Sequence, residues 1–194
     1  GGSALSGYKI YQSTDNSNFG SPIATQTATS LTVTSLTNGT TYYYKVLAYN
    51  AIGDGSLTAS VNGVPATTPG VPQSLSATKG VAQVALSWSA PASNGGTAVT
   101  GYKVYQSTDN SNFGSPIATP SGTSHTVTSL TNGTQYFFKV AAVNAVGDGS
   151  QTSSVNATPS TIPAVPTSLA ASAANNDTQI VLTWSAPTDT GGSA

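Results

Sequence analysis

The sequence YQSTDNSNFGSPIAT occupies residues 105–119, and residues 11–25 carry the same stretch without a change. The match continues outward at a constant offset of 94 residues, the offset between Tyr11 and Tyr105. Gly-Tyr-Lys precedes both copies, and VTSLTNGT follows them at residues 33–40 and 127–134. Self-similarity at a fixed period is the signature of a repeat array. The chain is therefore expected to consist of repeated copies of one structural unit.

Each unit alternates apolar and polar residues in short runs with turn residues between them, which predicts an all-β sandwich. In the central unit the expected strands are 73–78, 82–89, 99–107, 115–119, 123–129, 135–144 and 150–158. Seven strands is the number in an immunoglobulin-like sandwich. Alternation along the strands assigns these residues to the core: Leu86, Trp88, Tyr102, Val104, Val127, Tyr136, Phe138, Val140 and Ala142.

Several markers in a fixed order resemble the fibronectin type III family. They are a Pro-x-x-Leu opening at 72–75 and 166–169, a Trp followed by Pro, and a Leu-Thr-Asn-Gly-Thr-x-Tyr segment similar to that family's tyrosine corner. The hallmark residues are Trp88, Trp184, Leu36, Tyr42, Leu130 and Tyr136. The resemblance implies tandem seven-stranded sandwiches. The Cys-free, Ser- and Thr-rich composition is similar to repeats of this family from bacterial secreted and cell-surface proteins.

The repeat divides the chain into three predicted segments. Residues 1–66 hold the last five strands of one domain, 67–161 a complete domain, and 162–194 the first two strands of another. Gly-Gly-Ser-Ala occurs at 1–4 and again at 191–194, in the loop between the second and third strands. Half-sandwiches expose apolar surface and unpaired strand edges. We therefore expect head-to-tail self-association into a filament, either by strand complementation between chains or between neighbouring repeats of one chain.

The composition excludes several classes of function. Charged residues make up 6% of the 194 residues, and the net charge is -1. Nucleic-acid binding needs basic side chains that displace counterions, so no nucleic-acid partner is expected. No apolar run approaches the length that spans a bilayer, which predicts no membrane insertion in this segment. The chain has no Cys, which excludes disulfides and thiolate metal sites.

No catalytic residue, metal site or cofactor is predicted, and the chain is not expected to be an enzyme. His125 is the only His, and it stands where the first repeat has Leu31, so it is a packing position. Residues 13–18 and 107–112 resemble half of a calcium loop, but an Asx-turn accounts for the same residues. The Gly-Asp-Gly segments at 53–55 and 147–149 lack the Arg of an integrin motif, and a turn with positive φ explains their glycines.

Aromatic residues at outward strand positions form the candidate contact surface: Tyr11, Tyr43, Tyr49, Tyr105 and Phe137. Rings on a sheet face stack on sugars or pack against a neighbouring domain. The alternative is cross-strand stabilisation of the sheet itself.

These observations favour a structural or adhesive repeat segment of an extracellular fibre, stalk or adhesin. Paired prolines at 69–72 and 163–166 predict extended, semi-rigid linkers between the units. Two alternatives stay open. The chain is a spacer from a secreted carbohydrate-active enzyme, or it is a module that binds a glycan or a cell-surface receptor.

Overall fold

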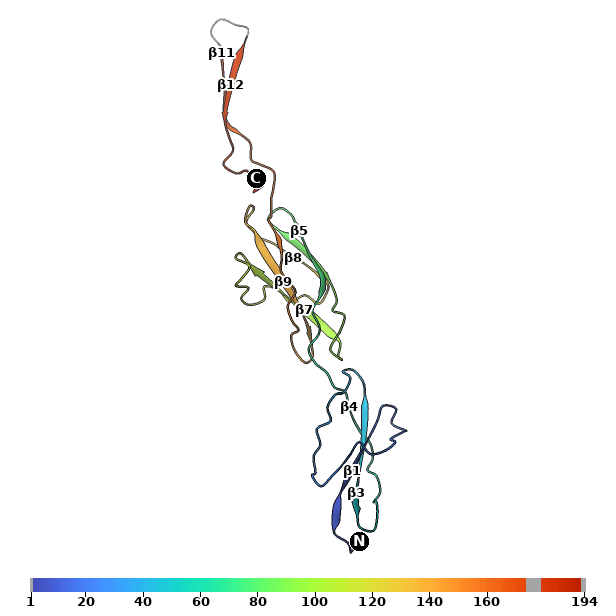
Figure 1. Ribbon diagram of the computed structural model, residues 1–194. Coiled ribbons are helices and arrows are strands. Elements are labelled where there is room, and N and C mark those ends of the chain that lie inside the picture. Colours follow the sequence, from blue (N-terminus) through green and yellow to red (C-terminus); the bar gives the residue numbers. More distant parts are fainter. Residues whose placement is uncertain (1, 174–178, 193–194) are drawn as a thin grey trace. The chain divides into compact units, whose positions relative to one another are not determined.

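The computed structural model describes residues 2–173 and 179–192, and these residues form strands and loops without a helix (Figure 1). The chain divides into two compact units, which we describe separately. The first unit holds residues 1–68 together with the loop segments 93–98 and 144–147, and the second holds the remaining residues. Gly1, Ser193 and Ala194, which belong to the repeated Gly-Gly-Ser-Ala sequence, lie outside the described residues.

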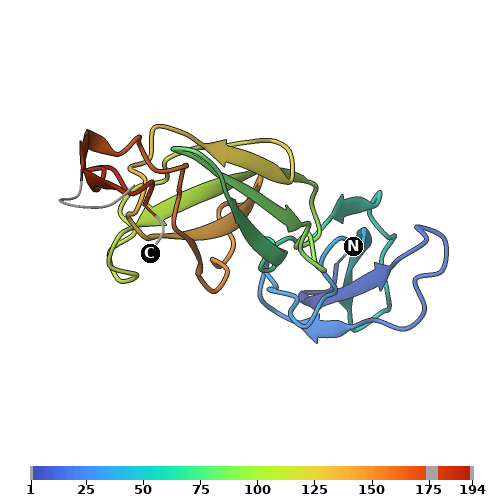
Figure 2. The ribbon, with the colours of Figure 1, turned by 90° about the horizontal axis from the view of Figure 1, so that it is seen from above.

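Besides a separate antiparallel pair described below, the second unit contains two antiparallel sheets, seen from above in Figure 2. One sheet has the order β5-β6-β8, formed by β5 (Gln73–Lys79), β6 (Val84–Ser89) and β8 (Ser124–Val127). The other has the order β10-β9-β7, formed by β7 (Val99–Ser107), β9 (Tyr136–Asn144) and β10 (Val155–Ala157). The pairs Val84–Val127 and Leu86–His125 fix the register of β6 on β8. This is the sandwich that the sequence predicts.

Alternate residues of the facing strands form the core of the second unit. Trp88 packs edge-on against Tyr102 with 5.4 Å between the ring centroids, and Phe138 is completely buried. Every residue that alternation assigned to the core belongs to this buried cluster. The predicted core is therefore confirmed.

Several predicted strands are shorter than expected, and the one at 123–129, for example, is reduced to β8. Residues 115–119 form only an isolated bridge between Val104 and Ala118, whereas the equivalent residues of the first unit form β2 (Ala24–Gln26). Pro120 stands where the first unit has Gln26, and proline has no N–H to extend the ladder. The strand expected at 150–158 is confined to β10. The Val140 N–H donates to Oγ1 of Thr152 at 3.1 Å, so a side chain enters the ladder there.

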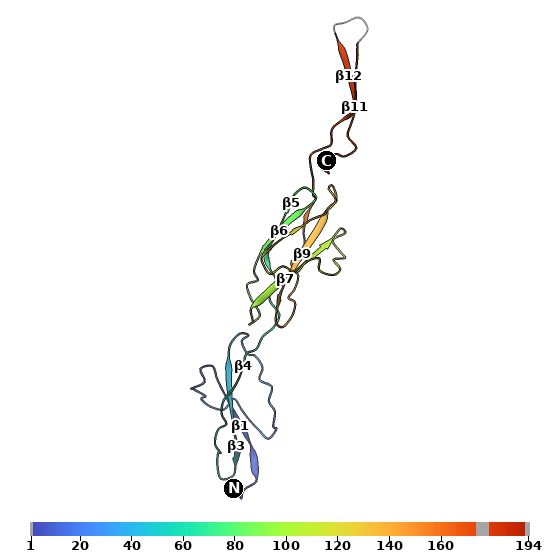
Figure 3. The same cartoon turned by 180° about the vertical axis from the view of Figure 1, so that it is seen from behind.

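The first unit is a single four-stranded sheet with the order β2-β1-β3-β4. Its other strands are β1 (Leu5–Ser13), β3 (Tyr42–Asn50) and β4 (Val61–Gly63), and β1 and β3 run side by side in Figures 1 and 3. Residues 30–33 form no strand, although their equivalents in the second unit form β8. The partner of β8 is β6, and the described part of the first unit contains no equivalent of β6.

A separate antiparallel pair is formed by β11 (Thr167–Ala173) and β12 (Ile180–Ser185). Its register, Thr167 with Ser185 and Ala173 with Ile180, reproduces that of Gln73 with Ser89 and Lys79 with Val84 in β5–β6. Both strands are exposed along their whole length. Trp184 is 61% exposed, against 5% for its equivalent Trp88.

Neighbouring aromatic residues on β9 provide a test of the core. Replacing Phe138 by Ala should lower the free energy of unfolding of the second unit by about 3–5 kcal/mol, because a large buried side chain is lost. Phe137→Ala is the matched control, since Phe137 is partly exposed on the opposite side of the strand. Urea unfolding of the full chain, followed by near-UV circular dichroism, measures both. Equal losses for the two variants would contradict the assignment of faces.

Candidate functional site

Aromatic rings lie beside lysines on the outward face of β1 and β3, and also on that of β7 and β9. In the second unit Nζ of Lys139 lies 4.3 Å from the centre of the Phe113 ring. In the first unit Nζ of Lys45 lies 4.6 Å from the centre of the Phe19 ring, in the equivalent position. A cation over a ring is attracted by the ring quadrupole. The long loop after β1 or β7 is thereby attached to the sheet.

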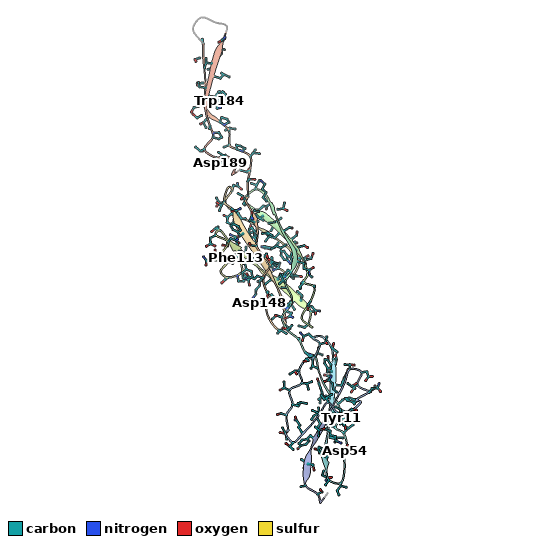
Figure 4. The ribbon with its side chains drawn as sticks, in the orientation of Figure 1. Tyr11, Asp54, Phe113, Asp148, Trp184 and Asp189 are labelled. Carbon is teal, nitrogen blue, oxygen red and sulfur yellow. The ribbon has the colours of Figure 1, made fainter. Side chains whose placement is uncertain are left out.

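Phe19 and Phe113 are two further aromatic residues of this site that the sequence pattern did not predict. The loop that carries Phe113 is visible in Figure 4, where this residue is labelled together with Tyr11 in the first unit. The available signal was a large apolar residue repeated without change in a Ser- and Asn-rich loop. Such a residue needs a surface to cover it.

The five predicted contact aromatics do not form one platform. Tyr11, Tyr43 and Phe137 are partly exposed, and Tyr49 is partly covered by Lys9, whose Nζ lies 5.4 Å from the ring centre. Tyr105 is only 9% exposed, so its predicted outward exposure is wrong. Val104 and Tyr105 are consecutive and both buried, which means that both sides of β7 are covered at this point.

The loops that resemble half of a calcium site are closed by their own aspartates. Oδ1 of Asp109 accepts the N–H groups of Ser111 and Asn112, both at 2.8 Å, and the Ser107 hydroxyl at 2.7 Å. Oδ2 accepts the side-chain amide of Asn112 at 2.8 Å. The N–H of Asn112, followed by the Ser107 hydroxyl and the N–H of Ser111, holds the pKa of Asp109 well below its usual range.

The same hydrogen bonds recur around Asp15 in the first unit, where the Ser13 hydroxyl is the main cause of a lowered pKa. Asn16 and Asn110 adopt φ of 61° and 59°, a left-handed conformation that Asn tolerates. The carboxylates are thus engaged within an Asx-turn. Among the described residues, no group of three or more His, Cys, Asp or Glu side chains is placed to hold a metal ion.

The Gly-Asp-Gly loops are held by an ion pair and by Asn. Lys103 pairs with Asp148, and Nζ of Lys9 lies 2.8 Å from Oδ2 of Asp54. Oδ1 of the buried Asn144 accepts the N–H of Val146 at 2.9 Å. The aspartates of these loops, labelled in Figure 4, are therefore tied to the sheet of their own repeat.

The glycines of these loops serve two different purposes. Gly53 and Gly147 adopt positive φ, at 155° and 148°, as the predicted turn requires. The second glycine of each loop has no positive φ, so that part of the prediction is wrong. A Cβ at Gly149 would overlap the carbonyl oxygen of Pro69, and one at Gly55 would lie 3.0 Å from that of Ala48. The second glycine is explained by close backbone approach.

The hallmark tyrosines make the same contact in both units. The hydroxyl of Tyr136 accepts the N–H of Thr131 at 3.1 Å, and that of Tyr42 accepts the N–H of Thr37 at 3.0 Å. The hallmark leucines differ. Leu130 is buried in the core, whereas Leu36 lines an open cavity of about 510 Å³ in the first unit. Within the described residues there is also no helix long and apolar enough to cross a membrane.

A sandwich of this topology, with a buried Trp on β6 and a tyrosine corner, defines an immunoglobulin-like β-repeat. The sequence profile described as "Fibronectin type III domain" matches residues 1–64 and 70–158. The chain belongs to the fibronectin type III family.

Similar repeats occur in proteins of very different kinds. Kelch domain-containing protein SSO1033 of Saccharolobus solfataricus is 39% identical over 75% of this chain and 20% of its own length. Exoglucanase B of Cellulomonas fimi is 34% identical over 97% of this chain and 18% of the enzyme. Titin domains A168–A170 share the fold, with a TM-score of 0.54 and 20% identity over 78% of this chain and 54% of the titin chain. The chain spans about a fifth of the two sequence relatives.

The aspartate loop gives a prediction about pH. The lowered folded pKa of Asp109 means that its carboxylate adds stability above the ordinary Asp value of about 4, and that this contribution is lost as the pH falls through the folded pKa. Asp109→Asn should therefore lower the urea midpoint at pH 7 and make it less sensitive to acid. Thr108→Ala, an exposed neighbour, is the control. An unchanged pH profile in Asp109→Asn would refute the role of the carboxylate.

Proposed function

We propose that this chain is a non-catalytic structural repeat segment of an extracellular or cell-surface protein, such as a fibre, stalk or adhesin, and that it holds other parts at a distance. The observation that carries the proposal is the reuse of one set of internal contacts in both units. The Asx-turns, the lysine–ring contacts and the lysine–aspartate pairs all recur at the offset of 94 residues. Each of these contacts joins a charged group to another group of the same repeat.

A spacer is expected to resist extension as a folded body. Pulling the full chain from both ends in a force microscope should give a discrete unfolding event for residues 70–158. The released contour should be about 300 Å, less the folded length, at 3.3–3.6 Å per residue. Phe138→Ala should lower the unfolding force, and Phe137→Ala should change it little, because only Phe138 is fully buried. Smooth extension without a discrete event would contradict the role of a folded spacer.

The exoglucanase relative supports a second candidate, a spacer from a carbohydrate-active enzyme. The similar region covers nearly all of this chain but a small part of that enzyme. In this setting the repeat connects other domains and needs no sugar site of its own. A glycan-binding module is the third candidate, and it would use the partly exposed rings of Tyr43 and Phe137.

Retention on insoluble cellulose and chitin separates these candidates. As a spacer, the full chain should remain in the supernatant, since lysines already cover several of its rings. Retention that is lost in Tyr43→Ala and Phe137→Ala, with the near-UV spectrum unchanged, would instead favour the binding module.

We also propose head-to-tail self-association of this segment, or the equivalent contact between neighbouring repeats of one chain. The repetition of one unit along the chain supports it, because the β11–β12 pair reproduces the register of β5–β6. The bacterial origin suggested by the composition belongs to the same proposal.

A further inference from the structure

The linker residue Thr67 is hydrogen-bonded through both polar groups of its backbone. Its N–H donates to the carbonyl oxygen of Gly95 at 2.8 Å. Its carbonyl oxygen accepts a hydrogen bond from Nδ2 of Asn144, also at 2.8 Å. Both partners come from loop segments of the first unit, to which Thr67 itself belongs. We call Gly95 and Asn144 together the backbone clamp.

The side chain of Asn144 is only 4% exposed, and both its nitrogen and its oxygen have partners. Nδ2 also donates to the carbonyl oxygen of Asn94 at 2.9 Å. Oδ1 accepts the N–H groups of Val146 at 2.9 Å and of Gly147 at 3.2 Å. A flip of the amide would oppose oxygen to oxygen and N–H to N–H. The surrounding backbone therefore fixes the orientation in which Asn144 holds Thr67.

Two consecutive glycines allow the backbones to approach closely. Gly95 and Gly96 adopt φ of 75° and 93°, a region that favours glycine. A Cβ at Gly95 would overlap the carbonyl oxygen of Thr67, and one at Gly96 would overlap the backbone nitrogen of Gly39. Because the obstructing atoms belong to the backbone, no flexible side chain can move aside. A larger residue at either position would displace its neighbour.

The glycine loop is shaped by polar groups of its own. Oγ of Ser93 accepts the N–H of Gly95 at 3.2 Å, and Oδ1 of Asn94 accepts the N–H of Gly96 at 2.9 Å. Short polar side chains of this kind stabilise turns by bonding to the backbone two residues on. The turn thus places the carbonyl group of Gly95 where the N–H of Thr67 meets it.

The same close approach recurs in the second unit, where Thr161 takes the place of Thr67. The N–H of Thr161 donates to the carbonyl oxygen of Gly191 at 2.7 Å. Gly191 and Gly192 adopt φ of 77° and 73°. A Cβ at Gly191 would overlap the carbonyl oxygen of Thr161, and one at Gly192 would overlap the backbone nitrogen of Gly133. The Gly-Gly sequence therefore serves the same purpose at both places.

We propose that the backbone clamp is a binding site for an extended chain segment, and that the linker at Thr67 is its built-in ligand. The clamp contacts the N–H and the carbonyl group of Thr67, whereas the Thr67 side chain is exposed. Main-chain hydrogen bonds provide affinity, and specificity for a sequence needs side-chain pockets. The clamp therefore accepts any residue at position 67 that has an N–H.

The clamp gives the linker an order that its prolines alone would not provide. Pro69 restricts the residue before it, Thr68, to extended conformations. Proline offers no N–H, however, and an extended segment without hydrogen bonds still moves relative to its surroundings. We expect residues 67 and 68 to be immobilised because the clamp holds Thr67 on both polar groups.

Amide hydrogen exchange of the full chain, measured by NMR, tests the site. The Thr67 N–H should exchange at least about tenfold more slowly than in the unfolded chain, because a bonded amide exchanges only when it opens. Asn144→Asp should remove most of this protection. The new carboxylate still accepts the N–H groups of Val146 and Gly147, but it repels the carbonyl oxygens of Thr67 and Asn94.

Asn156→Asp is the matched control for the added charge. Asn156 is exposed on β10, so this variant should keep the protection of Thr67. Equal losses of protection in Asn144→Asp and Asn156→Asp would overturn the role of Asn144. A Thr67 amide that exchanges at the unfolded rate in the wild-type chain would overturn the site as a whole.

Two variants at position 67 separate recognition of the backbone from recognition of the side chain. The NMR order parameter of the Thr68 amide should remain near about 0.85 in Thr67→Ala, which keeps the N–H. It should fall below about 0.6 in Thr67→Pro, which has no N–H to donate. A fall in Thr67→Ala, or an unchanged value in Thr67→Pro, would contradict recognition through the backbone.

Gly95→Ala tests the clamp with Asn144 in place, and it decides the matter if Asn144→Asp fails to fold. The added Cβ should displace Thr67 and abolish the protection of its amide. Near-UV circular dichroism should keep the signal of the buried Trp88, which lies in the second unit. Undiminished protection of Thr67 in Gly95→Ala would overturn the proposal.

Discussion

Burial of every second side chain of β6 between the two sheets is the interaction on which the second unit depends. Val84, Leu86 and Trp88 fill the space in front of Phe138 and Val140, and the ladder from β6 to β8 holds His125 and Val127 in place. The described part of the first unit has no equivalent of β6. Its sheet pairs from β2 to β4, residues 30–33 form no strand, and Leu31, Val33 and Leu36 line a cavity of about 510 Å³.

Polar groups perform a different task in this protein, which carries few charges. Asp15 and Asp109 organise the loops after β1 and β7, and their carboxylates are saturated by groups from the same loop. Lys45 and Lys139 lie over rings of those loops and connect them to the sheet. The charged side chains thus hold the loops of each repeat to its sheet, which leaves Ser and Thr to contact water.

The core and the positions of most strands could be predicted from the sequence, because alternation in β6, β7 and β9 directly records which side is buried. The errors arise where one residue overrides the pattern. Pro120 has no N–H to donate to the ladder. The Thr152 hydroxyl accepts the N–H of Val140 in place of a ladder acceptor. Tyr105 is buried although it alternates with the core residue Val104, and alternation cannot reveal that its outer side is covered. At the candidate site, Phe19 and Phe113 were missed because contacts between a loop and a sheet leave no periodic signal.

Pro120 has a consequence for how such repeats fold beside one another. Two neighbouring domains that share the sequence of residues 11–25 and 105–119 could exchange these segments while folding, since identical sequences fit either domain equally well. Misassembly of this kind propagates through unpaired backbone groups at sheet edges. The first unit offers Gln26 at the end of this segment, whereas the second offers Pro120, which lacks the N–H. The differences just beyond the shared sequence, which begin with Gln26 and Pro120, thus give each domain its own edge and favour correct pairing during folding.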